Sequence, residues 1–247
     1  MCGRFARRST QEVLADWFGI NLEEMPWFVP SFNIAPQSVQ PILRMNADSS
    51  GRECALARWG LVPSWAKDPK IGFSTINARA EEAASKPAFR EAMKKRHCLI
   101  PADAFYEWQR LEGKSRNPHA IALASGEPFA LAGLWECWTS KDGPPLETFT
   151  VLTTAPNELM SAIHNRMPVI LEPSDYDLWL TPEASSSIPT SLLKPFPASR
   201  MRAWPVGSRV GNVRNNDPQL LQPRGKETSE DAAQTPRMRP PSLFDNL

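Results

Sequence analysis

The residue best suited to covalent chemistry in this 247-residue sequence is the cysteine that directly follows the initiator methionine. Cysteine is small enough for Met1 to be removed before it, which leaves an α-amine and a thiol on one residue, Cys2. Such amines have pKa values of about 7.7 to 8.0 and such thiols about 8.5, so both have a nucleophilic fraction near neutral pH. The amine can attack an aldehyde to give an imine, and the thiol can then close a five-membered thiazolidine ring. We therefore expect an electrophilic carbonyl as the target.

A cysteine at this position also has a plain interpretation, as a small residue at a start site where Met1 is kept. Gly3 favours the reactive interpretation only modestly, because a residue without Cβ lets a ligand or another backbone approach closely. The other cysteines, Cys54, Cys98 and Cys137, have neither Cys-x-x-Cys spacing nor a histidine at zinc-ligand spacing. They are predicted to be buried thiols without disulfides, and no metal site is expected.

Polar side chains that suit proton transfer or anion binding occur further along the chain. Asn77 and Arg79 are two residues apart, so in an extended segment both point to one side. His164 carries an imidazole that can exchange a proton near neutral pH. Taken alone, these residues favour ordinary roles: a turn for Asn77, a surface ion pair for Arg79 and a hydrogen-bonded core position for His164. His97 and His119 are assigned to the core.

Glu107 is the carboxyl group with the most unusual surroundings, because aromatic residues stand on both sides of it. An apolar setting suits a carboxyl group to proton transfer. In a strand, Phe105 and Glu107 share one face while Tyr106 and Trp108 share the other. Both faces are partly apolar, so the sequence leaves open whether Glu107 is buried or faces solvent.

Composition and charge limit the kinds of protein that this sequence can encode. The 41% share of hydrophobic residues is enough for a substantial core, and 25 prolines indicate many ordered turns. A formal charge of +1 argues against binding nucleic acid by bulk charge, so phosphate contacts would need a few placed arginines. No apolar run approaches the roughly 18 residues of a membrane span, and the first residues lack the apolar stretch of a signal peptide. We expect a cytoplasmic enzyme.

These residues must be positioned by short elements, among which strands outnumber helices. Apolar periodicity and capping residues predict helices over residues 11–18, 87–95 and 174–180. Strand patterns cover residues 40–45, 54–59, 98–100, 104–108, 119–124, 129–135, 148–153, 169–171 and 201–206. Because the two types do not alternate regularly, we predict an α+β single domain with a largely antiparallel, barrel-like β core and a few flanking helices. Residues 1–222 form this domain, and the polar composition of residues 223–247 predicts a disordered tail.

Seven motifs in order give the sequence a family resemblance. They are MCGRF at residues 1–5, FNIAP at 32–36, WGLVPSW at 59–65, INARAE at 76–81, CLIPADAFYEW at 98–108, HNRMP at 164–168 and GNV at 211–213. The sequence resembles the SRAP family, SOS response-associated peptidase-like proteins that crosslink to abasic sites in single-stranded DNA. The resemblance implies a covalent thiazolidine between Cys2 and the open aldehyde of an abasic site, which protects the lesion during replication and SOS repair, with no metal or organic cofactor.

The resemblance also implies roles for individual residues around Cys2. Asn77 orients the N-terminal cysteine, Glu107 is the acid and base that serves its amine, and His164 donates a proton to the sugar oxygen or holds the imine. The implied phosphate ligands are Arg4, Arg79 and Arg166. Trp65 is a candidate for stacking on bases, and Asn33 and Pro36 either wedge against bases or form a tight turn.

Other functions remain open at this stage. Cys2 could be the nucleophile of an autopeptidase or amidohydrolase, and weak lyase activity would follow if the imine forms without ring closure. The chain could instead bind single-stranded DNA without chemistry. In the tail, Leu243 and Phe244 resemble a sliding-clamp ligand on a flexible tether. We expect a monomer that contacts no membrane.

Overall fold

The computed structural model describes residues 2–46, 48–113, 115–140, 143–181 and 190–225. The chain remains paired past the predicted domain boundary, because Pro223 forms a bridge with Val206 and the N–H of Arg224 donates to the Pro205 carbonyl at 2.8 Å. The folded part therefore extends at least two residues beyond residue 222. Residues 226–247, with the clamp motif at Leu243 and Phe244, lie outside the described residues, as does Met1.

Five strands close into a barrel. They are β3 (Val39–Met45), β4 (Arg52–Trp59), β6 (His97–Ala102), β9 (Phe129–Trp138) and β10 (Leu146–Thr154). β3 pairs with β4 and β6, β9 pairs with β6 and β10, and β10 closes the ring by pairing with β4. Only the β10–β4 contact in this ring is parallel. The predicted α+β fold with a largely antiparallel, barrel-like core is confirmed.

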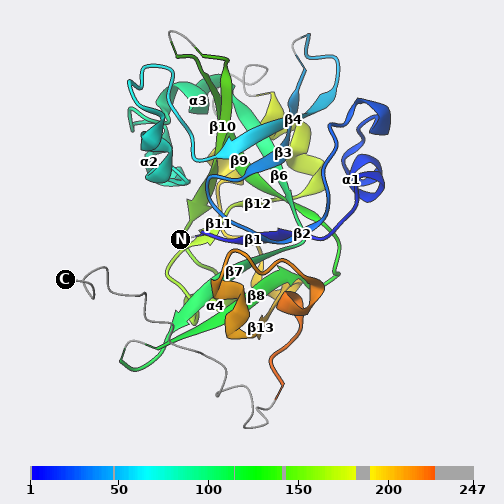
Figure 1. The fold of residues 1–247 in the computed structure, drawn as a ribbon, viewed down its shortest axis with the longest axis vertical. Coiled ribbons are helices and arrows are strands. Elements are labelled where there is room, and N and C mark those ends of the chain that lie inside the picture. Colours follow the sequence, from blue (N-terminus) through cyan, green and yellow to red (C-terminus); the bar gives the residue numbers. More distant parts are fainter. Residues whose placement is uncertain (1, 47, 114, 141–142, 182–189, 226–247) are drawn as a thin grey trace, which may run out of the picture.

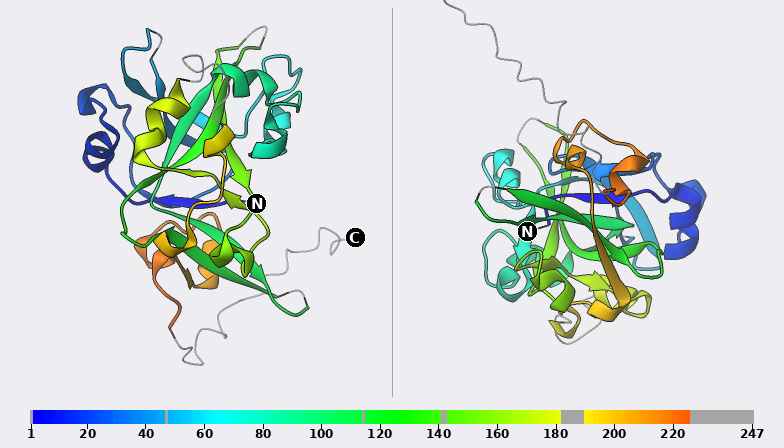
Figure 2. Two further views of the ribbon diagram at one scale, coloured as in Figure 1. Left: turned by 180° about the vertical axis from the view of Figure 1, so that it is seen from behind. Right: turned by 90° about the horizontal axis from the view of Figure 1, so that it is seen from below.

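A second sheet of five antiparallel strands contains the N-terminal strand. Its order is β13 (Met201–Pro205), β8 (Arg116–Leu123), β7 (Ala104–Arg110), β1 (Phe5–Arg7) and β2 (Ser31–Ile34). β1 crosses the middle of the molecule, between the barrel and the β7–β8–β13 part of this sheet (Figure 1, Figure 2). Phe5 packs edge-on against Trp59 of the barrel, with ring centroids 5.2 Å apart. The strand that follows Cys2 is therefore fixed where the two sheets meet.

Three short strands extend the barrel near this junction. β5 (Asn77–Arg79) runs parallel to β10, β11 (Met167–Pro168) also pairs with β10, and β12 (Ile170–Leu171) pairs with β9. The sequence analysis predicted a strand at 169–171, which contains β12, but none at β1, β2, β5 or β11. These strands have two to four residues, too few for alternation to show in the sequence.

The helices are short and lie outside the barrel (Figure 1). They are α1 (Gln11–Phe18), α2 (Ala80–Ala83), α3 (Arg90–Lys95), α4 (Glu158–Ser161) and α5 (Tyr176–Leu180). Single 3₁₀ turns occupy Leu22–Glu24, Pro69–Phe73, Pro173–Asp175, Thr190–Leu192, Ala198–Arg200, Ser208–Gly211 and Pro218–Leu221. Helix α1 has the predicted bounds, and Gly19 ends it in the left-handed region at φ 63°. Helix α3 begins three residues later than predicted, because residues 86–89 form a turn in which the Lys86 carbonyl accepts from Phe89 and Arg90.

All four cysteines are free thiols, as predicted. Cys2 and Cys98 are fully buried, whereas Cys54 and Cys137 are only half-buried, so the expectation of burial was wrong for those two. In the described part of the chain, no helix has both the length and the apolar character needed to cross a bilayer.

Candidate active site at the N-terminus

Cys2 is completely buried, in the hydrophobic cluster that joins the barrel to the second sheet. Arg4, two residues after Cys2, is held by β7, because the N–H of Tyr106 donates to the Arg4 carbonyl at 2.9 Å. Burial, reinforced by the negative charge of Glu107, raises the pKa of the Cys2 thiol to about 12. The thiol is therefore protonated at neutral pH, and it needs a proton acceptor before it can act as a nucleophile.

Asn77 contacts Cys2 directly. β5 sets Asn77 beside Val151 of β10, and the Asn77 Nδ2 amide donates to the Cys2 carbonyl at 2.8 Å. Its Oδ1 atom is buried and has no hydrogen-bond partner among the described residues. A buried amide oxygen of this kind is suited to accept from an N–H group close to Cys2. The interpretation of Asn77 as a turn residue is wrong, since it lies in a strand.

Glu107 and His164 form the ionisable part of the site. Glu107 is 4% exposed, which answers the question that the sequence left open: the Phe105–Glu107 face of β7 is buried. The imidazole Nδ1 of His164 lies 4.0 Å from Glu107 Oε1, and it lies 3.1 and 3.2 Å from the backbone nitrogen and the carbonyl oxygen of Arg166. Nδ1 accepts from that N–H in one tautomer and donates to that carbonyl in the other. The β7–β8 pairing also sets His119 directly opposite Glu107. His119 is hydrogen-bonded to the Asn117 carbonyl but only half-buried, so the predicted core position was wrong.

A groove of about 360 Å³ begins at Asn77. Its walls are Trp65, Asn77, Arg79, Glu82, Lys86, Pro87, Ala88 and Phe89, three of which the sequence singled out. Trp65 is 56% exposed, and its indole N–H donates to the Pro87 carbonyl at 3.3 Å. Arg79 is exposed and forms an ion pair with Glu82 at 3.2 Å. An exposed indole beside cations is the kind of surface that binds single-stranded nucleic acid.

Arg4 and Asn33 have well-defined partners on the other side of β1. One Arg4 guanidinium nitrogen donates to Asn33 Oδ1 at 2.8 Å and to the Val210 carbonyl at 2.9 Å. Asn33 is 5% exposed, and its amide nitrogen donates to the carbonyls of Asn212 and Asn215 at 3.0 and 2.8 Å. Both side chains therefore tie the segment after β13 to the second sheet. A direct contact of either residue with DNA stays a prediction.

Pro36 lies in a tight turn, as one of the two interpretations of its motif predicted. The N–H of Ser38 donates to the Ala35 carbonyl, and Gln37 has a positive φ of 71°. The Gln37 amide donates to the carbonyls of Trp59 at 3.2 Å and Gly72 at 3.0 Å. The turn thereby fixes the start of the segment that carries Trp65. Gln37 could not be predicted from the sequence, because glutamine rarely adopts a positive φ.

Arg166 is engaged by a carboxylate in this structure. Its two terminal nitrogens donate to the two oxygens of Glu81, each at 2.9 Å, and one of them also donates to the Thr153 carbonyl. The sequence did not indicate Glu81 as a partner, because the two residues are 85 positions apart. Arg166 and His164 come from the same loop after α4, so the loop brings a cation and the imidazole to the site together.

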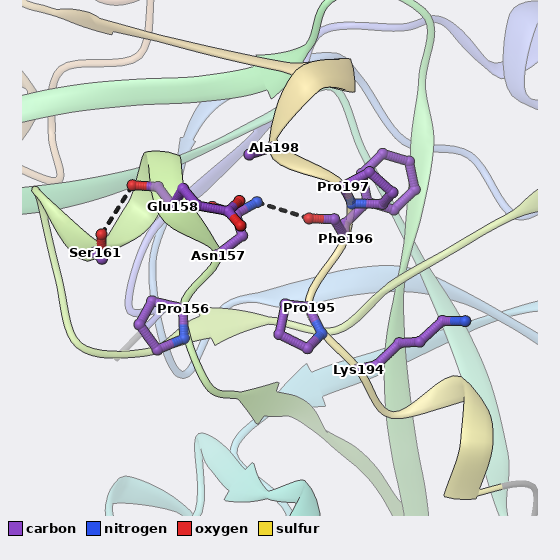
Figure 3. Close-up of a pocket in the computed structure, with 9 residues that line it drawn as sticks. All are labelled: Pro156, Asn157, Glu158, Ser161, Lys194, Pro195, Phe196, Pro197 and Ala198. Carbon is purple, nitrogen blue, oxygen red and sulfur yellow. Dashed lines mark hydrogen bonds between the residues drawn. The ribbon is translucent and has the colours of Figure 1, made fainter.

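A separate pocket of about 570 Å³ lies beside α4, between residues 156–161 and 194–198 (Figure 3). Proline rings form much of its wall, and the Asn157 amide donates across it to the Phe196 carbonyl at 2.7 Å. None of the sequence-predicted site residues lines it. Among the described residues, no group of three His, Cys, Asp or Glu side chains is arranged to hold a metal ion.

Comparisons with known proteins agree on one family. A family model described as SOS response associated peptidase (SRAP) matches residues 1–213. The chain is 45% identical over 225 residues to the abasic site processing protein YoqW of Bacillus subtilis, covering 90% of this chain and 99% of that protein. YoaM of Bacillus subtilis is 46% identical, covering 90% and 97%, and HMCES of Gallus gallus is 35% identical, covering 78% and 66%. Both are also named abasic site processing proteins.

Solved structures resemble this fold over most of its length. A protein from Bacteroides thetaiotaomicron superposes with a TM-score of 0.76 at 27% identity, covering 89% of this chain and 99% of the other. A protein from Bordetella bronchiseptica gives a TM-score of 0.71 at 29% identity, covering 83% and 100%. The architecture of a closed barrel with a second sheet is therefore shared by proteins that differ at most positions.

Proposed function

The chain belongs to the SOS response associated peptidase (SRAP) family, and from this premise we propose that it processes abasic sites in DNA. More specifically, Cys2 forms a covalent thiazolidine with the aldehyde of an abasic site in single-stranded DNA. The observation that supports this proposal most strongly is the set of groups around Cys2. The Asn77 amide donates to the Cys2 carbonyl, the buried Glu107 carboxylate acts on the Cys2 thiol, and the His164 imidazole lies beside Glu107.

The reaction has two steps, and the burial of Cys2 supports their order. Once Met1 is removed, the neutral amine attacks the aldehyde carbon, and loss of water gives an imine. The thiol, held protonated by burial, then adds across the C=N bond: sulfur bonds to carbon and the thiol proton moves to nitrogen through Glu107. His164 donates a proton to the sugar oxygen when the ring opens. No outside oxidant or reductant is needed.

Asn77 has a positioning role in this mechanism. Its Nδ2 holds the Cys2 carbonyl, which leaves the orphaned Oδ1 to accept from the Cys2 amine. Fixing both reacting groups on one residue converts ring closure into an intramolecular step, which is the kind of reaction that accelerates most by orientation.

The groove at Asn77 provides a path for the strand. We propose that a base stacks on Trp65 while Arg79, Arg166 and Arg4 approach the phosphates on either side of the reacting sugar. Such binding needs only a few cations, in agreement with the formal charge of +1. The protein would act at the nucleoid during repair and replication, as a protecting crosslink.

Other activities of the same residue define the rival outcomes. If the imine persists without ring closure, β-elimination nicks the strand, which is lyase activity. If Cys2 instead attacks amides, the chain is an autopeptidase or amidohydrolase, and if no bond forms it is a binding module. The proposed clamp contact through Leu243 and Phe244 would tether any of these activities to replication.

A gel experiment separates these outcomes. Labelled single-stranded DNA with one abasic site is incubated with the wild-type protein and with Cys2→Ala, which keeps a removable Met1 and a free amine but has no thiol. We expect a denaturation-stable crosslink with the wild type, and with Cys2→Ala a crosslink only when cyanoborohydride traps the imine. Turnover of glutamine or peptide without a DNA adduct would reject the proposal in favour of a thiol hydrolase.

A further inference from the structure

Two consecutive glutamates form ion pairs with cationic side chains next to the Cys2 site. Glu81 binds Arg166 through two hydrogen bonds of 2.9 Å. Glu82 lies 3.2 Å from Arg79 and 3.5 Å from Lys86. Arg79, Glu82 and Lys86 all line the groove that begins at Asn77. Arg79 and Arg166, two of the arginines proposed to approach the phosphates, and Lys86 in the same groove are thus already paired with carboxylates of the protein itself.

The local fold directs both glutamates outward. In helix α2, Ala80 and Ala83 are buried against the molecule, which leaves the two residues between them on the outer side. The chain then turns back, because the Glu82 carbonyl accepts from the N–H groups of Ser85 and Lys86. This turn brings the Lys86 ammonium back to the Glu82 carboxylate.

The ion pairs of Glu82 are open to a competing anion, because the side chains of Arg79, Lys86 and Glu82 are 61%, 56% and 40% exposed. In the other pair, Glu81 is 53% exposed and Arg166 is 17% exposed, so an anion reaches Arg166 by displacing Glu81. Hydrogen bonds from Arg166 and Arg79 lower the pKa of Glu81 and Glu82 respectively, so both are ionised at neutral pH. A carboxylate and a phosphate diester present the same oxygen fork to an arginine, so one can replace the other.

We propose that Glu81 and Glu82 compete with the DNA backbone for Arg166, Arg79 and Lys86. This competition weakens the binding of undamaged single strands. Stable retention of DNA then depends on the covalent step at Cys2. The inference rests on the proposed function, because it assumes that the strand follows this groove. In the free protein, the same carboxylates hold the three cations in position. When DNA binds, its phosphates replace the carboxylates.

The discriminating experiment measures affinity for undamaged DNA, which offers no aldehyde. Fluorescence anisotropy with a labelled, undamaged single strand is compared for wild type, Glu81→Gln and Glu82→Gln. The control is Glu91→Gln, which removes the same charge on α3, where Glu91 pairs with Lys94 at 3.1 Å and with Arg90 at 3.7 Å, outside the groove lining. We expect the Kd for the undamaged strand to fall about threefold or more for Glu81→Gln and for Glu82→Gln, in the range set by exposed ion pairs. The Kd should change less for Glu91→Gln.

A second measurement gives the consequence for selectivity. Undamaged strand is added as a competitor to the crosslinking reaction, and we expect Glu81→Gln and Glu82→Gln to be inhibited at lower competitor concentrations than the wild type. The inference would be overturned if Glu81→Gln and Glu82→Gln bound the undamaged strand no more tightly than Glu91→Gln does. Crosslinking by the wild type would be unaffected by that result, so the proposed function would stand. If the wild type neither bound nor crosslinked any single strand, the proposed function itself would fail.

Discussion

Cys2 combines complete burial with the chemistry of an N-terminal amine and thiol. A thiol whose pKa is raised to about 12 by burial is almost entirely protonated at neutral pH, so it is a poor nucleophile until a proton acceptor is engaged. Glu107, buried at 4% exposure and close to His164, is the acceptor that the geometry offers. Burial shields the thiol from electrophiles and oxidants in solution. In the proposed reaction the amine therefore attacks first.

The first prediction concerns alkylation of this thiol. Iodoacetamide at pH 7.5 should label Cys2 at least about 100-fold more slowly in the folded protein than in urea, because burial shifts the thiol from its ordinary value of 9.0 to about 12 and lowers the thiolate fraction. Mass spectrometry of the N-terminal peptide measures both rates. Similar rates in the two states would show that the thiol is neither buried nor shielded.

The family resemblance, and not the residue types alone, singled out Asn77, Glu107 and His164. In the structure, Asn77 donates to the Cys2 carbonyl, Glu107 contributes to the raised pKa of the Cys2 thiol, and His164 lies 4.0 Å from Glu107. Their roles in a reaction stay a prediction. The burial of Glu107 was not predictable, because aromatic residues occupy both faces of its strand. The pairing of Arg166 with Glu81 was not predictable either, because it joins the loop after α4 to helix α2, which are far apart in the sequence.

Short elements, rather than the barrel strands, position the site. β1 follows Cys2, β5 carries Asn77, and the turn of residues 35–38 fixes the segment leading to Trp65. Four barrel strands were predictable from runs of six or more residues, and α1 from its periodicity and from Gly19. β6 was predicted over residues 98–100 only, although it spans His97–Ala102. β1 and β2 were not predictable, since each is defined by its partners and not by its own pattern.

A prediction follows for the turn at Gln37. Gln37→Ala removes two hydrogen bonds to the carbonyls of Trp59 and Gly72 and should lower the free energy of unfolding by about 1 to 3 kcal/mol. Gln37→Gly removes the same bonds but tolerates the positive φ of 71°, so it should be about 0.5 to 1 kcal/mol more stable than Gln37→Ala. Urea unfolding of the two variants tests this, and a glycine variant no more stable than the alanine variant would argue against strain at this turn.

The whole molecule places its reactive terminus where two sheets share one core. The buried cluster around Cys2 takes side chains from the barrel, such as Trp59 and Phe149, and from the second sheet, such as Phe5 and Phe105. The general architecture was predictable because strands outnumber helices without alternating with them. Closure of the barrel was not, because it depends on the parallel contact of β10 with β4, which no local pattern encodes.

Burial of several thiols and phenols predicts how stability depends on pH. Burial raises the pKa of Cys2, Cys54 and Tyr176 to about 12 and also raises that of Cys98 and Tyr106. Above pH 9 the unfolded chain loses thiol protons that the folded chain keeps, so the free energy of unfolding should fall as pH rises from 9 toward 12.

Each of the two fully buried thiols, Cys2 and Cys98, contributes about 2 kcal/mol to this loss at pH 10.5. Urea unfolding in the presence of a reductant at pH 7.5, 9.0 and 10.5 measures it. We expect little change up to pH 9 and a clear decline at pH 10.5. A constant free energy of unfolding across this range would contradict the burial of these groups.

In the proposed product, the amine and the thiol of Cys2 both bond to the aldehyde carbon of an abasic site. The mass of the N-terminal peptide tests this after reaction with abasic single-stranded DNA, nuclease and protease digestion, and iodoacetamide treatment without any reductant of imines. We expect a peptide that starts at Cys2, carries the sugar remnant less one water, and resists alkylation because its sulfur lies in the ring. A peptide that retains Met1, an alkylated Cys2, or a sugar remnant on another residue would contradict it.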